Sequence, residues 1–320
     1  MIGDAFMKLN RNVVTKSVCS VGSVWWLGVL WVLSVWLHPL RAQDALPVCP
    51  VAQCSLQATD TLPGLWQRVD TLRLPGIMLP KAFRQVASNE LIDSLGLLNP
   101  FWEKLQQLYT GVCRDTLHVV HVGDSHIRGH IFPQTVGTGM QQAFGALRYT
   151  DYGINGACCP SFTRPERLAR IVSLKPDLLI LSFGTNESHN RRYNSQLHYR
   201  QMDELVRLLR RALPDVPILM TTPPGSYDSF RQRKRRRTYQ VNPRTLQAVR
   251  TIHRYADRNG VAVWDMYEVF GGVKRAALNW WESGLMRPDH VHYLSEGYEL
   301  QGRMLFQALL KAYNHFITEQ

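Results

Sequence analysis

The sequence predicts an α/β fold with three layers, in which helices cover both faces of a central, mostly parallel sheet. Two observations predict it. Short apolar runs of strand length recur from residue 117 onward, and amphipathic stretches of helical period separate them. Strands that alternate with helices in this way form parallel sheets, whose functional sites lie at the carboxyl ends of the strands.

Four runs have the composition of buried strands, and each is bounded by turn residues or by a helical pattern. They cover residues 117–122, 178–183, 217–221 and 261–264. A helix is expected to begin at Asn99 and Pro100, since asparagine caps helices and proline suits the first helical position. Further apolar stripes predict helices over 202–212 and 246–256 and a last helix from Ser295.

The first 42 residues have the pattern of a signal peptide. Basic residues precede an apolar run over 24–37, and a small residue at Ala42 marks the expected cleavage site. The alternative is an uncleaved membrane anchor, because the run extended back to Val18 nearly reaches the roughly 20 residues that span a bilayer. We therefore expect an exported protein, periplasmic or at the cell surface, or one anchored in the inner membrane.

Residues 43–98 form a proline-containing extension with no regular period, and residues 99–320 form the expected single catalytic domain. Within the extension, Cys49 and Cys54 frame a short loop that an oxidising compartment would close as a disulfide. The other cysteines after residue 42 supply no second pair at zinc-finger spacing, so no metal site is expected. They are Cys113, Cys158 and Cys159.

The formal net charge of +12 is unevenly distributed along the chain. The leader contributes +3, which leaves +9, and six of those charges lie in residues 231–237. Such a run usually forms a solvated loop. The alternative is an electrostatic rim that attracts an anionic polysaccharide surface, with Arg233, Arg235 and Arg236 as candidate substrate contacts. The run lacks interleaved aromatic residues, so no specific nucleic-acid partner is expected.

The chemistry-bearing residues follow the strands. The first strand ends in Gly123-Asp124-Ser125-His126, which presents a serine at the mouth of the sheet, and another ends before Asn186, whose amide can donate to an oxyanion. Near the end of the chain, Asp289 and His292 are close enough for one loop to present a carboxylate and an imidazole. A serine needs such a base, and the base needs a partner that fixes its tautomer.

A fourth segment is the loop Gly153-Ile154-Asn155-Gly156-Ala157, where the backbone N–H of Gly156 could donate to the same oxyanion as Asn186. Together the four segments, in this order, resemble the SGNH or GDSL hydrolase family over about residues 115–313. The resemblance implies a flavodoxin-like, three-layer sheet. It also implies roles for five residues: nucleophile Ser125, base His292, orienting carboxylate Asp289, and oxyanion donors Gly156 and Asn186 with the Ser125 amide.

The chain departs from the family pattern at two positions. His126 replaces the usual leucine, so it is a candidate substrate contact or a hydrogen-bonded residue at a helix start. The glycine segment reads G-I-N-G in place of the commoner serine-glycine-aspartate form. His290 competes with His292 as base, but its spacing from Asp289 is less suitable.

The resemblance implies a serine esterase that works through an acyl-enzyme without metal or cofactor, most similar to exported enzymes that remove O-acetyl groups from cell-wall or surface carbohydrate. One alternative is a polysaccharide O-acetyltransferase with the same triad. Another is a catalytically idle, basic module that binds anionic glycan or nucleic acid. The expected partner is an acylated carbohydrate or other small ester, and a membrane only if the leader stays uncleaved.

Overall fold

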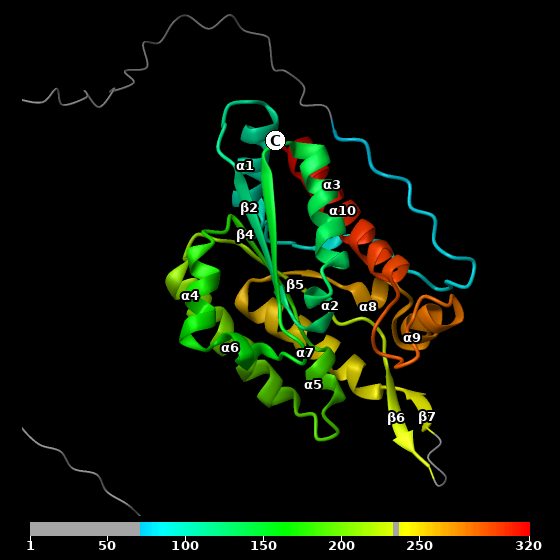
Figure 1. Ribbon diagram of the computed structural model, residues 1–320. Helices are drawn as coiled ribbons and strands as arrows, with labels where there is room; N and C mark the ends of the chain where they lie inside the picture. The colour runs from blue at the N-terminus through cyan, green and yellow to red at the C-terminus, as the bar shows by residue number, and fades with distance from the viewer. Residues whose placement is uncertain (1–70, 233–236) are drawn as a thin grey trace, which may run out of the picture. The chain divides into compact units, whose positions relative to one another are not determined.

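A six-stranded sheet forms the centre of the structure, in the order β1-β8-β5-β4-β2-β3 (Figure 1). All neighbouring strands run parallel except the short edge strand β1, which pairs antiparallel with β8. The strands are β1 (Leu91–Ile92), β2 (Leu117–Gly123), β3 (Leu147–Gly153), β4 (Leu178–Ser182), β5 (Ile218–Thr221) and β8 (Ala262–Trp264).

The computed structural model describes residues 71–232 and 237–320. The expected signal peptide or anchor, the Cys49–Cys54 loop and the beginning of the extension therefore lie outside the described residues, as do Arg233, Arg235 and Arg236. No helix in the described ranges is long and apolar enough to cross a membrane.

Successive residues of the strands face opposite sides of the sheet, and this alternation separates two apolar cores. In β4, Leu178 and Ile180 belong to one core, whereas Leu179 and Leu181 belong to the other. Apolar side chains on both faces explain why the strands are continuous hydrophobic runs. The three-layer α/β/α fold predicted from the sequence is therefore confirmed.

Two groups of helices supply the outer layers (Figure 1). The first core packs against α1 (Asn99–Tyr109), α3 (Ile131–Phe144) and α10 (Ser295–Thr318). The second packs against α4 (Pro165–Ser173), α6 (Ser195–Ala212) and α7 (Pro243–Asn259). The remaining helical elements are α2 (Ser125–Arg128), α5 (Thr185–His189), α8 (Met266–Val269), α9 (Gly272–Glu282) and the 3₁₀ turn η1 (Cys159–Phe162).

The described part of the proline-containing stretch packs on the sheet domain. Leu72, Ile77 and Phe83 contact the first core, and the indole N–H of Trp264 donates to the side-chain oxygen of Asn89 at 2.9 Å. Residues 71–98 lack a regular period because, apart from the two residues of β1, they follow the domain surface in extended and turn conformations.

One segment differs from the sequence expectation. The basic run 231–237 was expected in a solvated loop, but its two ends belong to an antiparallel hairpin of β6 (Tyr227–Arg231) and β7 (Arg237–Val241), in which Arg231 pairs with Arg237. The hairpin extends away from the central sheet (Figure 1). Charged and polar residues dominate both strands, and aromatic residues such as Phe230 and Tyr239 do not recur at every second position, so no strand pattern was recognised in the sequence.

Candidate active site

The nucleophile segment is positioned by the end of β2. Gly123 is the last residue of this strand, Asp124 caps α2, and Ser125 is the first helical residue. A Cβ atom at Gly123 would lie 2.4 Å from Cγ1 of Ile127 and 2.7 Å from the Ser182 carbonyl oxygen, so a side chain there would prevent the tight turn. The glycine therefore allows the strand to lead directly into the helix that presents Ser125.

Sheet register places the segments of the two predicted oxyanion donors, Gly156 and Asn186, beside this turn. Gly123 is paired with Gly153 at the end of β3 and with Ser182 at the end of β4. The loops that carry Gly156 and Asn186 therefore leave the sheet at the same edge as Ser125. The amide N–H of Ile154 also donates to the Gly123 carbonyl at 3.1 Å, which holds the Gly156 loop against the nucleophile segment.

Ser125, His292 and Asp289 form a hydrogen-bonded chain. Nε2 of His292 lies 2.8 Å from Oγ of Ser125, and Nδ1 lies 2.8 Å from Oδ2 of Asp289. Because an ionised carboxylate only accepts, Nδ1 carries the proton and Nε2 is free to accept the Ser125 hydroxyl proton. This is the tautomer that a serine nucleophile requires.

The Asp289 carboxylate is fixed by its own loop. Its Oδ1 accepts hydrogen bonds from the amides of Val291 and His292, both at 2.9 Å. Partial burial acts to raise the pKa of Asp289, but these amides and the His292 ring outweigh it and hold the pKa below its usual value. An ionised Asp289 in this position is able to stabilise a protonated His292 ring.

His290 is not in the hydrogen-bonded chain. Its ring stacks on Tyr239 of the hairpin and on Trp281 of α9, with centroid distances of 3.7 and 3.9 Å. Its backbone has a φ of 60°, which is uncommon for a residue with a side chain. The Tyr227 amide donates to its carbonyl at 3.0 Å. The geometry therefore favours His292 as the base and makes His290 the point at which the hairpin contacts the catalytic loop.

Asn186 lies on α5 and points its amide toward the nucleophile segment. Its Nδ2 donates to the Ala157 carbonyl at 3.0 Å and to Oδ2 of Asp124 at 3.3 Å. Burial raises the pKa of Asp124 to about 7, opposed by the hydrogen bond from the His126 amide. Gly156 lies in the exposed turn after β3 with a φ of 70°. Its role as an oxyanion donor stays a prediction.

His126 is buried beside the base. Its Nδ1 lies 3.0 Å from the Tyr298 hydroxyl, and its ring centroid lies 5.3 Å from that of His292. Burial, with a smaller effect from His292, lowers the pKa of His126 to about 3, so the ring is neutral. This geometry fits a hydrogen-bonded residue at the start of α2, and contact with substrate stays a prediction.

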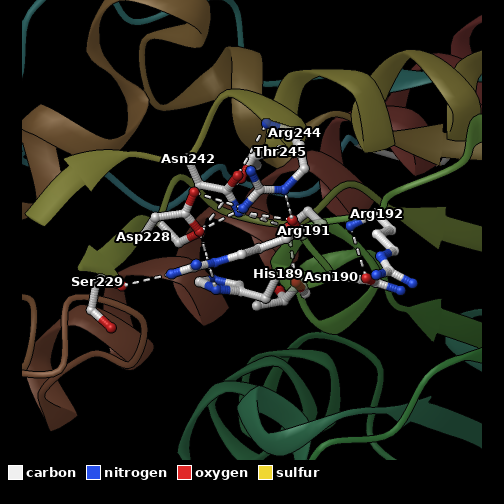
Figure 2. Close-up of polar contacts among 12 residues, drawn as sticks. His189, Asn190, Arg191, Arg192, Asp228, Ser229, Asn242, Arg244 and Thr245 are labelled. Carbon is white, nitrogen blue, oxygen red and sulfur yellow. Dashed lines mark hydrogen bonds and ion pairs between the residues drawn. The ribbon is translucent and has the colours of Figure 1, made fainter. Parts of the chain in front are cut away.

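Sequence reasoning missed a polar cluster that joins the base of the hairpin to α5 (Figure 2). Arg244 donates to both carboxylate oxygens of Asp228 at 2.6 Å and to the Ser188 carbonyl at 2.8 Å. Nε2 of His189 lies 3.1 Å from Oγ of Ser226. The cluster ties the helix that carries Asn186 to the hairpin that contacts His290.

The His189 side chain is partly buried. Burial lowers the pKa of His189. Asp228 opposes this shift, whereas Arg244 and His292 act in the same direction as burial. The only sequence signal for it is its spacing from Asn186, which is one helical turn earlier on α5.

Exposed arginines border this cluster. The Arg191 guanidinium lies 5.2 Å from the Phe230 ring centroid and donates to the Ser229 carbonyl (Figure 2). Arg192, Arg231 and Arg237 are exposed as well. The α5–hairpin side of the molecule is therefore rich in positive charge.

Comparison with known proteins agrees with this geometry. Residues 121–300 match the GDSL-like lipase/acylhydrolase family. A solved structure described as a peptidoglycan O-acetylesterase superposes with a TM-score of 0.63 at 17% identity, over 70% of this chain and 99% of that one. A GDSL-like lipase from Bacteroides thetaiotaomicron VPI-5482 matches with a TM-score of 0.46 at 18% identity, over 67% and 98% of the two chains.

A search of curated protein sequences found no match. The family match covers more than half of the chain and includes Ser125, Asn186, Asp289 and His292. It assigns the chain to the carboxylic ester hydrolases, in agreement with the SGNH-type fold. The chain belongs to the GDSL-like lipase/acylhydrolase family.

Proposed function

We propose that this protein removes O-acetyl groups from a cell-wall or surface carbohydrate through an acyl-enzyme on Ser125. The observation that carries the proposal is the 2.8 Å contact between Oγ of Ser125 and Nε2 of His292. The substrate class is supported by the solved structure of the same fold that is described as a peptidoglycan O-acetylesterase.

The reaction has two halves. In the first, His292 accepts the Ser125 proton while Oγ attacks the acetyl carbonyl, and the protonated base then gives that proton to the departing sugar oxygen. In the second, His292 accepts a proton from water as the water attacks the acetyl-enzyme. The imidazolium then returns this proton to Oγ of Ser125 as the acyl–oxygen bond breaks and acetate leaves. Asp289 stays ionised throughout and stabilises the imidazolium.

The negative charge on the carbonyl oxygen needs donors at the sheet edge. The Ser125 amide, the Gly156 amide and Asn186 Nδ2 are the proposed donors. In the free protein the amide group of Asn186 makes a longer contact to Asp124, at 3.3 Å, than to the Ala157 carbonyl. We expect the oxyanion to replace the contact to Asp124.

The test follows acetate release from an O-acetylated glycan by the exported protein, with Ser125→Ala as control. The expected result is one acetate for each acetyl group lost from the glycan. Loss of acetyl groups from one glycan with their appearance on an unacetylated acceptor would instead assign the protein as an O-acetyltransferase. Glycan binding without turnover would correspond to an idle binding module.

The location of the protein is part of the same proposal. An acetylated cell-wall glycan lies outside the cytoplasm, and the signal-peptide pattern of residues 1–42 fits export. Sequencing the amino terminus of the protein recovered from the producing cells tests this, with Gln43 as the expected first residue. A chain that retains residues 1–42 in the membrane fraction would correspond to the anchored form.

We further propose that the basic hairpin favours acidic polymeric substrates. Exposed Arg191, Arg192, Arg231 and Arg237 support this, since clustered positive charge raises encounter rates with polyanions. Replacing Arg233, Lys234, Arg235 and Arg236 with Gln should raise KM for an acidic polymer, most strongly at low salt, and leave a small neutral ester unaffected.

A matched control removes four positive charges from α6 and α7, which pack against the second core. Arg200, Arg207, Arg211 and Arg258 are exposed on α6 and α7. Replacing them with Gln changes the net charge equally and should not alter KM for the polymer. Equal KM values for the hairpin variant and this control at low salt would contradict a role for the hairpin charge.

A further inference from the structure

Three buried side chains with metal-ligating atoms lie close together, outside the hydrogen-bonded triad. They are Cys159 of η1, Glu187 of α5 and His198 of α6. Each is at most 6% exposed, and the thiol sulfur, a carboxylate oxygen and an imidazole nitrogen all lie within 4.8 Å of one another. A buried thiol, carboxylate and imidazole this close together need a specific chemical explanation.

The hydrogen bonds around His198 determine its tautomer. Oγ1 of Thr251 donates to the Gln247 carbonyl at 2.7 Å, so this hydroxyl accepts from the Tyr193 hydroxyl at 2.9 Å. Because the Tyr193 hydroxyl donates its one proton to Thr251, its oxygen can only accept from Nδ1 of His198, which lies 2.9 Å away. Nδ1 therefore carries the proton of the neutral ring, and Nε2 presents a lone pair.

That lone pair faces another acceptor. Nε2 of His198 has no hydrogen-bond partner and lies 4.0 Å from Oε1 of Glu187. Two buried acceptor atoms at this distance are not hydrogen-bonded to each other and attract a cation between them.

The carboxylate is already held for such a role. Oε2 of Glu187 accepts from the Gly184 amide at 2.9 Å, and Oε1 accepts from the Cys159 amide at 3.1 Å. These bonds fix the orientation of the carboxylate and leave further lone pairs available.

We propose that Cys159, Glu187 and His198 bind a Zn²⁺ ion. Sulfur and nitrogen ligands select zinc over magnesium or calcium. Zinc bonds of about 2.0–2.3 Å place tetrahedral ligand atoms about 3.3–3.8 Å apart, so small side-chain adjustments close the observed spacing. Binding converts the Cys159 thiol to a thiolate and releases its proton to solvent. Cys158 or water completes the coordination.

The ion would join three elements that the site depends on. Cys159 follows the Gly156 loop, Glu187 is adjacent to the oxyanion residue Asn186, and His198 anchors both to α6. Zinc would therefore stabilise the fold and position the oxyanion donors without contacting the substrate.

The first measurement is the zinc content of the full-length protein produced with zinc in the medium and purified without chelator. The expected result is about one zinc per chain. After removal by a chelator, added Zn²⁺ at a hundredfold excess over its dissociation constant should raise Tm by about 5–10 °C. Co²⁺ in its place should give thiolate-to-cobalt absorption.

Variants then locate the ion. Cys159→Ser should abolish the thiolate-to-cobalt absorption and His198→Gln should lower the zinc content, whereas Cys113→Ser, a change to another unpaired thiol outside the cluster, should retain both. The zinc content and Tm of the wild-type protein do not depend on whether a variant folds, so these two measurements decide whether the site binds zinc. Active wild-type protein that contains no zinc and shows no Tm change with added Zn²⁺ would overturn the proposal, and would leave a buried His198–Glu187 pair.

Discussion

The ring of Tyr239 stacks on the ring of His290 at a centroid distance of 3.7 Å, so the β6–β7 hairpin contacts the loop that carries Asp289 and His292. Trp281 covers the opposite side of the same imidazole. The two rings hold His290 in its left-handed backbone conformation, which is costly for a residue with a Cβ. The hairpin therefore supports the geometry of the triad.

Removing this contact should disturb catalysis without removing a catalytic group. Tyr239→Leu should lower kcat on a small aryl acetate by about tenfold with KM little changed, since an aromatic pair contributes about 0.5–1.5 kcal/mol. Tyr239→Phe keeps the ring and should retain kcat. Steady-state kinetics of the two variants at one pH make the comparison. An unchanged kcat in Tyr239→Leu would mean that the loop holds its conformation alone.

The oxyanion assignment of Asn186 makes a stronger prediction. Asn186→Ala should lower kcat by about 10²–10³ with a small effect on KM, as expected when one donor to the transition state is lost. Asn190→Ala, a surface asparagine just after the same helix, is the matched control and should behave like wild type. Equal kinetics for the two variants would remove Asn186 from the oxyanion site.

The two histidines of the catalytic loop should differ in their effects. His292→Ala should be as damaging as Ser125→Ala, and combining the two changes should cost little more, because members of one triad fail together. His290→Ala should retain more activity, since it loses only the stacked contacts. Measuring the three variants and the double variant on one ester tests this ranking, and a more severe loss in His290→Ala would reverse the assignment.

Stability should depend on pH through His121, a fully buried residue of β2. Its ring contacts the Tyr149 hydroxyl and Ser182 Oγ at 2.8 and 2.6 Å, and burial lowers its pKa from 6.5 to about 3. Between these values the unfolded chain binds more protons, so His121 stabilises the fold above pH 6.5, and that contribution is lost as pH falls toward 3.

His121→Gln keeps both hydrogen-bonding partners and removes the titration. Between pH 6 and 4 the unfolding free energy of the variant should fall less steeply than that of wild type, by up to about 1.4 kcal/mol per pH unit. Urea unfolding at several pH values measures the two slopes. Parallel slopes would show that His121 does not titrate differently in the two states.

The sequence predicted those parts of the fold in which a local pattern matches the tertiary environment. The apolar runs at 117–122 and 178–183 became β2 and β4 because both faces of these strands are buried. By contrast, β3 was missed because this edge strand keeps polar residues such as Arg148 and Asp151 at its partly exposed positions.

The site divides in the same way. The serine, the amide and the aspartate–histidine pair lie at strand ends or in one short loop, where motif and position coincide. The roles of Tyr239, Arg244 and His189 depend on contacts between segments distant in sequence, which no local pattern reveals. The sequence did not predict the Cys159–Glu187–His198 cluster for the same reason, since Cys159 and Glu187 are 28 residues apart.

We infer that Ser125 is the nucleophile and that His292 activates it. The most direct measurement treats the protein with a fluorophosphonate and locates the adduct by peptide mass spectrometry. The account predicts one adduct per chain, on Ser125, absent in Ser125→Ala and formed far more slowly in His292→Ala. An adduct on another residue, or equally fast labelling of Ser125 in His292→Ala, would contradict it.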